Sequence, residues 1–230
     1  MRTRIYMLDV GGLAGDLPAD EKRIMDWASG LSEYRQEKIE RMKFREDKLL
    51  SLGAGLLLSQ GLKDWGLSEQ TADFAYRENG KPFLRYYPDR HFNLSHSGSQ
   101  VMAVFSDYEV GCDVEQVKSG KLRIASRFFT EKEQAYLADP ALSESGRDAL
   151  FTRLWTLKES VLKVTGAGMG MALNSFEFSL SDPVKVSLGK EYSFLEYGLE
   201  GYRAAVCVKG GQEVLSDVFC SFQKLQDVVR

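Results

Sequence analysis

Three observations predict an α+β protein of two similar-sized lobes. Strand-like and helix-like segments alternate in clusters in both halves of the 230 residues. No low-complexity linker separates the two halves, and no internal repeat is strong enough to identify from the residues alone. A chain of this length can bury a sizeable core without disulfide bonds. We place the boundary between the lobes at residues 108 and 109, which gives segments 1–108 and 109–230.

The first half predicts one strand, two helices and then three short strands. Residues 3–10 alternate as strand residues do, and Asp16-Leu17-Pro18 resembles a helix start with proline in the first turn. Helices are expected around residues 24–27 and from 46 to 62, a turn at 79–82, and strands at 92–94, 101–105 and 110–114.

The second half predicts two helices followed by four short strands. Thr130 and Glu133 have the spacing of a capping box at a helix start. A longer helix is expected from about Ser145 to Thr165, where Gly166 can adopt the left-handed cap. The strands are expected at 176–180, 184–188, 192–197 and 202–208.

The composition excludes several classes of protein. A hydrophobic content of 43% and a charged content of 27% are typical of soluble domains, and a net charge of −3 gives no attraction to nucleic acid or an anionic membrane. No apolar run reaches the roughly 20 residues that span a bilayer. Three cysteines without a CxxC pair, and only two histidines, argue against a disulfide framework and a zinc site. We expect a cytoplasmic protein.

Two carboxylates share one face of a predicted strand. Asp113 and Glu115 lie two residues apart, so their side chains point to the same side. Neighbouring carboxylates repel unless a cation lies between them, and Mg²⁺ prefers such oxygen ligands. A solvent-facing acidic pair on an edge strand is the alternative.

The later helix carries a second group of polar residues. Trp155, Glu159 and Lys163 follow at four-residue intervals, so they stack on one helix face. A surface Glu–Lys pair beside a core tryptophan would explain the spacing. A face that lines a cleft fits better, because the rest of this helix is rich in leucine.

Two further motifs are weaker by themselves. Ser95 and His96 follow a predicted strand and could donate to a phosphate, although a histidine there is often structural. Lys81 lies in a tight turn, where lysines are common.

Together, these motifs resemble those of one enzyme family. Gly111-Cys-Asp-Val-Glu115 and Trp155-Thr-Leu-Lys-Glu-Ser-Val-Leu-Lys163 resemble the two signature motifs of 4′-phosphopantetheinyl transferases. Segments 79–82, 92–98 and 127–133 resemble further motifs of the surfactin-synthetase-activating (Sfp) type, in the expected order. Cys112 departs from the usual isoleucine or valine, which is a packing change. The resemblance implies two pseudo-symmetric α/β lobes with the active site in the cleft between them.

The resemblance also implies a reaction and its central residues. Asp113, Glu115 and Glu159 would hold Mg²⁺, or Mn²⁺ in its place, against the pyrophosphate of coenzyme A. The serine hydroxyl of an apo acyl- or peptidyl-carrier protein would attack the β-phosphorus and expel 3′,5′-ADP. Lys163 would neutralise phosphate charge, and Glu159 is our candidate general base.

The remaining coenzyme A contacts follow from the same resemblance. Ser95 and His96 would contact the nucleotide's phosphates, and Lys81 would hold the adenosine end. Additional contacts fall at positions aligned through Glu46-Asp47, namely Arg35, Lys38 and Ser51.

The roles of Glu133 and Lys158 stay open, and so do the docking site and the identity of the carrier. Glu133 either caps a helix or is an acid near the active site, and Lys158 either orients Glu159 or faces solvent. Carriers of this class are typically acidic, so a basic stretch after the metal strand would dock them, with a solvated helix face as the alternative. This stretch consists of Lys118, Lys121, Arg123 and Arg127. Fatty-acid, polyketide and nonribosomal-peptide carriers all stay open, as does the use of acylated coenzyme A.

Two rival functions share these residues. A Mg²⁺-dependent nucleotide hydrolase would use Glu159 to activate water, but this explains only the carboxylates. A non-catalytic relative would be expected to lack a metal ligand, and all three positions are occupied by carboxylates here. We therefore expect a monomeric transferase.

Overall fold

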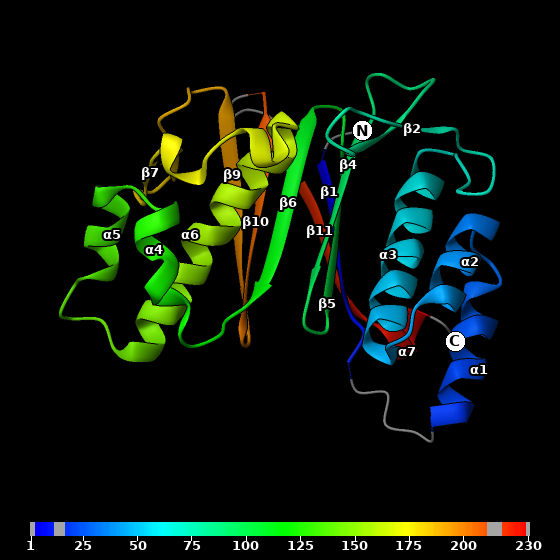
Figure 1. Cartoon of the computed structure of the whole chain (residues 1–230). Coiled ribbons are helices and arrows are strands. Elements are labelled where there is room, and N and C mark those ends of the chain that lie inside the picture. Colours follow the sequence, from blue (N-terminus) through cyan, green and yellow to red (C-terminus); the bar gives the residue numbers. More distant parts are fainter. Residues whose placement is uncertain (1–2, 12–16, 211–217, 229–230) are drawn as a thin grey trace.

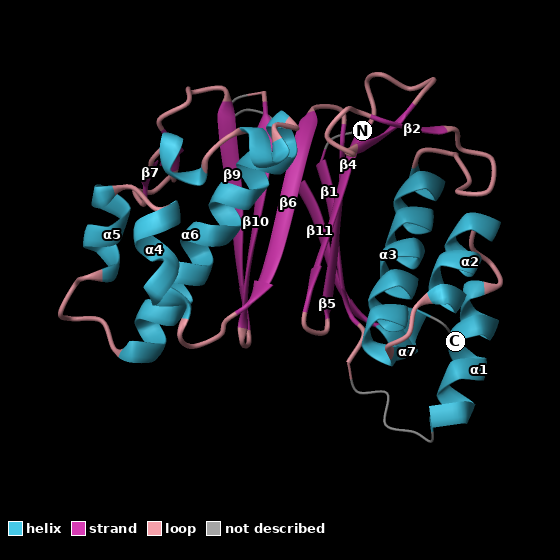
Figure 2. Cartoon of the chain, viewed as in Figure 1, coloured by secondary structure: helices cyan, strands magenta, loops and turns pink. Residues whose placement is uncertain are grey.

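The computed structural model describes residues 3–11, 17–210 and 218–228. These residues form two main β-sheets, and helices cover the outer side of each sheet (Figures 1 and 2). The mixture of helices and strands agrees with the predicted α+β class. Asp16, part of the predicted first helix start, lies outside the described residues.

The helices fall into two groups along the chain. The first group is α1 (Leu17–Ala28), α2 (Glu33–Arg41) and α3 (Arg45–Asp64). The second group is α4 (Ala125–Phe128), α5 (Glu131–Leu137) and α6 (Glu144–Thr165), and a short α7 (Leu225–Val228) follows later. The described residues also form three 3₁₀ turns: η1 (Lys121–Ile124), η2 (Gly168–Gly170) and η3 (Leu173–Ser175).

The first main sheet has the strand order β11-β1-β5-β4. Its members are β1 (Thr3–Asp9), β4 (His91–Ser97), β5 (Gln100–Ser106) and β11 (Val218–Lys224). β11 pairs in parallel with β1, whereas β1, β5 and β4 are antiparallel. The end of the chain therefore returns to the strand with which it began.

The second main sheet has the order β6-β10-β9 and is antiparallel throughout. Its members are β6 (Glu109–Gln116), β9 (Tyr192–Leu199) and β10 (Tyr202–Lys209). Two small hairpins lie outside the main sheets: β2 (Phe74–Tyr76) with β3 (Pro82–Leu84), and β7 (Phe178–Ser179) with β8 (Lys185–Val186).

Three apolar clusters hold these layers together. On β1, Tyr6 and Leu8 face helices α1 to α3, while Ile5 and Met7 face the second sheet. Because side chains alternate along a strand, each strand of this kind can bury both of its faces. The middle cluster joins the two sheets, and a third lies between the second sheet and helices α4 to α6.

Most predicted elements are present, but α2 and β11 were missed, and so were the shorter β2, β3, α4 and α7. α2 has Ser32 as its N-cap, yet its sequence Glu-Tyr-Arg-Gln-Glu-Lys-Ile-Glu-Arg shows almost no apolar periodicity. The expected capping box at Thr130 is present, and α6 ends at Gly166 with a φ of 68°. No helix in the described part of the chain is long and apolar enough to cross a membrane.

Candidate active site

The predicted carboxylates border one depression between the two main sheets. The cavity measures about 380 Å³ and is lined from β4, β6 and α6. Its lining consists of Leu94, Ser95, His96, Asp113, Glu115, Trp155, Glu159 and Lys163. The strand pair and the helix face that the sequence predicted separately therefore meet at the same place.

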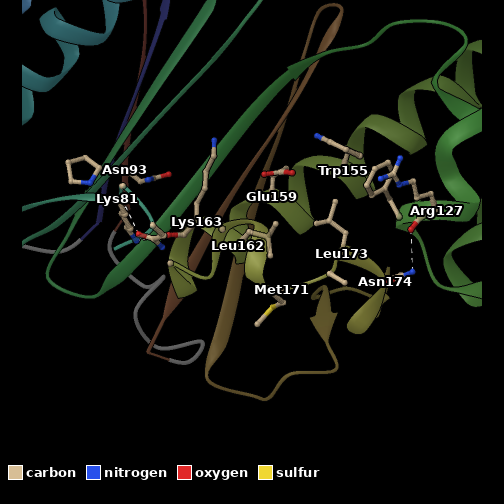
Figure 3. Close-up of a pocket in the computed structure, with 17 residues that line it drawn as sticks. Lys81, Asn93, Arg127, Trp155, Glu159, Leu162, Lys163, Met171, Leu173 and Asn174 are labelled. Atoms are coloured by element: carbon tan, nitrogen blue, oxygen red, sulfur yellow. Dashed lines mark hydrogen bonds between the residues drawn. The ribbon is translucent and has the colours of Figure 1, made fainter. Parts of the chain in front are cut away.

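A larger cavity of about 770 Å³ adjoins this depression and shares Trp155, Glu159 and Lys163 with it. Figure 3 shows its two ends, with Lys81 on one side and Arg127 on the other. At the Arg127 end, the side-chain amide of Asn174 donates to the Arg127 carbonyl at 3.2 Å. The two adjoining cavities therefore have a size that suits small-molecule ligands.

Close contact between β6 and α6 brings the carboxylates to the helix. Gly111 allows this approach, because a Cβ atom there would lie 2.8 Å from the carbonyl carbon of Lys163, and closer still to Ser160 and Val164 backbone atoms. Asp113 and Glu115 follow on the same face of β6. The glycine thus places both carboxylates opposite Glu159 and Lys163.

Strand β4 faces β6 through side chains instead of a backbone ladder. The amide nitrogens of alternate β6 residues, Cys112, Val114 and Gln116, donate to side-chain oxygens of Asn93, Ser95 and Ser97 at 2.9, 3.3 and 3.2 Å. The hydroxyl of Ser95 also donates to Asp113 Oδ1, and that of Ser97 to Glu115 Oε2, each at 2.9 Å. Two serines therefore orient the two carboxylates.

Lys163 is the cation next to Asp113. Its Nζ lies 2.8 Å from Asp113 Oδ1 and 2.9 Å from Ser95 Oγ. Burial would lower the pKa of Lys163, but interactions with Asp113, Cys112 and Glu159 together outweigh burial, and the pKa is raised. Burial raises the pKa of Asp113, although Lys163 opposes this shift. The site thus holds a fixed positive charge beside a buried carboxylate.

The other two carboxylates have different surroundings. Burial and the nearby charge of Asp113 raise the pKa of Glu159. A carboxyl with a raised pKa accepts a proton more readily, which suits a general base. Glu115 is partly exposed, and besides Ser97 it faces Lys121, whose Nζ lies 3.6 Å from Glu115 Oε2.

The three carboxylates would have to move closer together to bind one metal ion. Among residues 3–11, 17–210 and 218–228, no three His, Cys, Asp or Glu side chains stand close enough together to hold one ion. Lysines engage Asp113 and Glu115 instead. However, Asp113 Oδ2 is buried and has no hydrogen-bond partner among the described residues. Because an unpaired buried oxygen is costly, this atom fits a cation ligand.

Lys81 ties the helix to the strand. Its Nζ donates to the carbonyl of Val110 at 3.0 Å and to that of Lys163 at 2.5 Å, at the C-terminal end of α6. A cation is favourable at that end of a helix. Burial lowers the pKa of Lys81 to about 8. Lys81 lines the larger cavity, and its ammonium is directed to backbone carbonyls.

The other predicted coenzyme A contacts are spread more widely. Ser95 and His96 line the depression, and burial lowers the pKa of His96, with Lys163 and Lys38 adding to the shift. Arg35 and Lys38 line a separate cavity of about 550 Å³, where Arg35 Nε lies 3.5 Å from Glu69. Ser51 is buried on α3, away from these three cavities.

Glu133 and Lys158 form a fully buried ion pair at 2.8 Å. Glu133 completes the capping box at Thr130 and accepts the amide of Phe178 at 2.8 Å. Lys158 donates to the carbonyls of Leu173 and Phe176, each at 2.7 Å. The helix-capping alternative for Glu133 is therefore correct. The solvent-facing alternative for Lys158 is wrong, because the side chain is buried and its ammonium is directed to Glu133 and two backbone carbonyls.

The sequence interpretation missed several residues that shape the site. Asn93 and Ser97 were not singled out, although an Asn-x-Ser-x-Ser alternation on a strand is a readable signal of a polar face. Met171 and Leu173 line the larger cavity from a short connection and the first residue of η3, which are too short to carry a periodic pattern.

Comparison with known proteins identifies the family. Residues 109–207 match the model of the 4′-phosphopantetheinyl transferase superfamily. A 4′-phosphopantetheinyl transferase of Bacillus subtilis is 34% identical over 82% of this chain and 85% of its own length. The transferase Sfp of Bacillus subtilis strain 168 is 32% identical over 87% of this chain and 92% of its own.

A solved structure adds a partial likeness. A holo-(acyl-carrier-protein) synthase from Bacillus anthracis, in complex with coenzyme A (3′,5′-ADP), covers 46% of this chain and 97% of its own at 17% identity, with a TM-score of 0.40. The long matches at 30% identity or more decide the family. The chain therefore belongs to the 4′-phosphopantetheinyl transferase family, which confirms the predicted transfer of phosphopantetheine from coenzyme A to a carrier protein.

Proposed function

We propose that this transferase is magnesium-dependent and uses Asp113, Glu115 and Glu159 as the ligands of the ion, with Mn²⁺ as a substitute. The observation that carries this proposal is the buried Oδ2 of Asp113, which has no hydrogen-bond partner among the described residues and lies in a depression that the other two carboxylates also line. Mg²⁺ takes oxygen ligands and commonly binds one or two carboxylates together with substrate phosphates. When bound, it would neutralise charge on the diphosphate of coenzyme A.

Residues of the chain would then supply the general base and the stabilisation of phosphate charge. The acceptor is a serine hydroxyl of an apo acyl- or peptidyl-carrier protein. Its oxygen forms a bond to the β-phosphorus of coenzyme A while the bond to 3′,5′-ADP breaks. Glu159 takes the hydroxyl proton, since burial and Asp113 raise its pKa. Lys163 stabilises the charge on the phosphate oxygens, because its ammonium is held in the depression by Asp113 and Ser95.

Coenzyme A would lie across the depression and the larger cavity. Ser95 and His96 would meet its phosphates, while Lys81 and Pro82 line the end suited to adenosine. Lys38 would approach from the neighbouring cavity, since its charge already acts on His96. Arg35 and Ser51 would need to change their present contacts, because both are buried.

We also propose the finer architecture and setting of the enzyme. Segments 1–108 and 109–230 would be two pseudo-symmetric lobes with the cleft between them, although β11 pairs with the first sheet.

The carrier would dock on the basic stretch, where Lys118, Arg123 and Arg127 are exposed. The enzyme would act as a cytoplasmic monomer, without nucleic acid or membrane.

Intact-mass spectrometry of apo-carriers tests this function. The protein, coenzyme A and Mg²⁺ should add one phosphopantetheine to a carrier, whereas a nucleotide hydrolase would leave its mass unchanged. Glu159→Gln should abolish transfer. Glu144→Gln, an exposed acid at the start of the same helix, is the matched control and should keep the rate. Equal rates for the two variants would rule out the assigned role of Glu159.

A further inference from the structure

Lys121 joins the basic stretch to the carboxylate site. It begins η1, directly after Gly120, and its Nζ lies 3.6 Å from Glu115 Oε2. The two side chains are 30% and 26% exposed, so both can be reached from solvent. The other basic residues of the stretch form no ion pair with any described residue; they are Lys118, Arg123 and Arg127. Lys121 alone among the four is paired with a proposed metal ligand.

The oxygen that Lys121 faces is also the one that Ser97 orients. Ser97 Oγ donates to Glu115 Oε2 at 2.9 Å, and the same hydroxyl accepts the amide of Gln116 at 3.2 Å. If Lys121 moved away, the serine would still hold the Glu115 carboxylate at the edge of the depression. Departure of the lysine would therefore free a preoriented negative charge.

We propose that Lys121 couples carrier docking to metal binding: it neutralises Glu115 in the free enzyme and releases this carboxylate when an acidic carrier engages its ammonium. The inference rests on the proposed function, since it takes Glu115 as a metal ligand and the basic stretch as the docking surface. The Nζ of Lys121 lies 3.6 Å from Glu115 Oε2, which is longer than a hydrogen bond, so Glu115 holds this ammonium weakly and a carboxylate on the carrier can compete for it.

This competition has a thermodynamic consequence. A cation and Lys121 are alternative neutralising partners of one carboxylate, so anything that removes the lysine strengthens cation binding. By linkage, the cation must strengthen carrier binding by the same factor. Partly exposed ion pairs are weak, and removing this one should strengthen cation binding by about two- to fivefold.

An acidic carrier would also attract a cation through its overall field, without any role for Lys121. A matched variant separates the two effects. Lys118→Met removes the same charge from the same stretch but touches no carboxylate of the depression. Lys121→Arg keeps a cation beside Glu115 and should behave as the wild type does.

The experiment measures binding of Mn²⁺ to the full chain by electron paramagnetic resonance, without coenzyme A. Each protein is titrated alone and with an apo-carrier whose acceptor serine is replaced by alanine. We expect Lys121→Met alone to bind Mn²⁺ about two- to fivefold more tightly than Lys118→Met and the wild type. The carrier should strengthen Mn²⁺ binding by the wild type and Lys118→Met, and by clearly less in Lys121→Met.

The possible outcomes distinguish a failure of this inference from a failure of the proposed function on which it rests. Wild-type protein that takes up no Mn²⁺ would overturn both the metal site and the coupling. Suppose instead that the wild type binds Mn²⁺, and that it modifies an apo-carrier with its serine intact when coenzyme A is added in the intact-mass assay. Equal Mn²⁺ binding by Lys121→Met and Lys118→Met would then overturn the coupling and leave the function standing.

Discussion

Replacing Gly111 by alanine should separate β6 from α6, and so test whether their contact builds the site. The new Cβ would lie 2.8 Å from the Lys163 carbonyl carbon and closer to Ser160 and Val164 backbone atoms. Carbon atoms in contact prefer about 3.5–4.0 Å, so the helix must move outward by about 1 Å. The neighbouring atoms are backbone, and therefore no side-chain rotation relieves the clash.

The size of the effect follows from this movement. Overpacking of a core costs about 1–3 kcal/mol, and we expect about 3 kcal/mol because both partners are backbone. For a chain of this length, each kcal/mol lowers Tm by about 2–4 °C, so Gly111→Ala should melt about 6–12 °C lower. A shift of about 1 Å at Glu159 and Lys163 should slow transfer by about 100-fold.

The measurements are thermal unfolding and the transfer rate at saturating coenzyme A and Mg²⁺. Gly198→Ala is the matched control, because it lies on β9 and its added Cβ would meet nothing within 4 Å. This control should change Tm by no more than about 2 °C, since surface substitutions stay within about 0.5 kcal/mol. If Gly111→Ala matched the control in both stability and rate, the role assigned to this contact would be wrong.

Three other outcomes are expected. Lys158→Met leaves Glu133 charged and buried, so urea unfolding should show a loss of about 3–5 kcal/mol in stability. The Glu133→Gln/Lys158→Met double variant should recover part of this stability, and no recovery would contradict the pairing. Lys81 has a pKa of about 8 when folded and an ordinary pKa of 10.5, so the folded state releases its proton first as the pH rises. The free energy of unfolding should therefore rise between those pH values, and Lys81→Met should flatten that rise in urea midpoints. Removal of divalent ions with EDTA should stop transfer, and Mg²⁺ should restore it; undiminished transfer would exclude a metal requirement.

The sequence predicted the elements that bear the site because their patterns are local. The capping box at Thr130 and the glycine stop at Gly166 are set by neighbouring residues, so both were readable. Asp113 and Glu115 alternate on a strand, and Glu159 and Lys163 repeat on a helix, so each shared face was predictable.

Much of what escaped prediction depends on contacts between distant residues. The pairing of β11 with β1 joins opposite ends of the chain. The burial of Lys158 reflects Glu133 and the carbonyls of Leu173 and Phe176, which a helical pattern cannot reveal. The side-chain link between β4 and β6 likewise depends on how two sheets approach each other.

The central claim is that Asp113, Glu115 and Glu159 hold one divalent ion beside the diphosphate of coenzyme A. The most direct measurement is anomalous diffraction from crystals grown with Mn²⁺ and coenzyme A. We predict a single anomalous peak in the depression, in contact with the three carboxylates and the diphosphate, with the Lys121–Glu115 pair opened. Coenzyme A bound with no peak there, or with its diphosphate outside the depression, would contradict the claim.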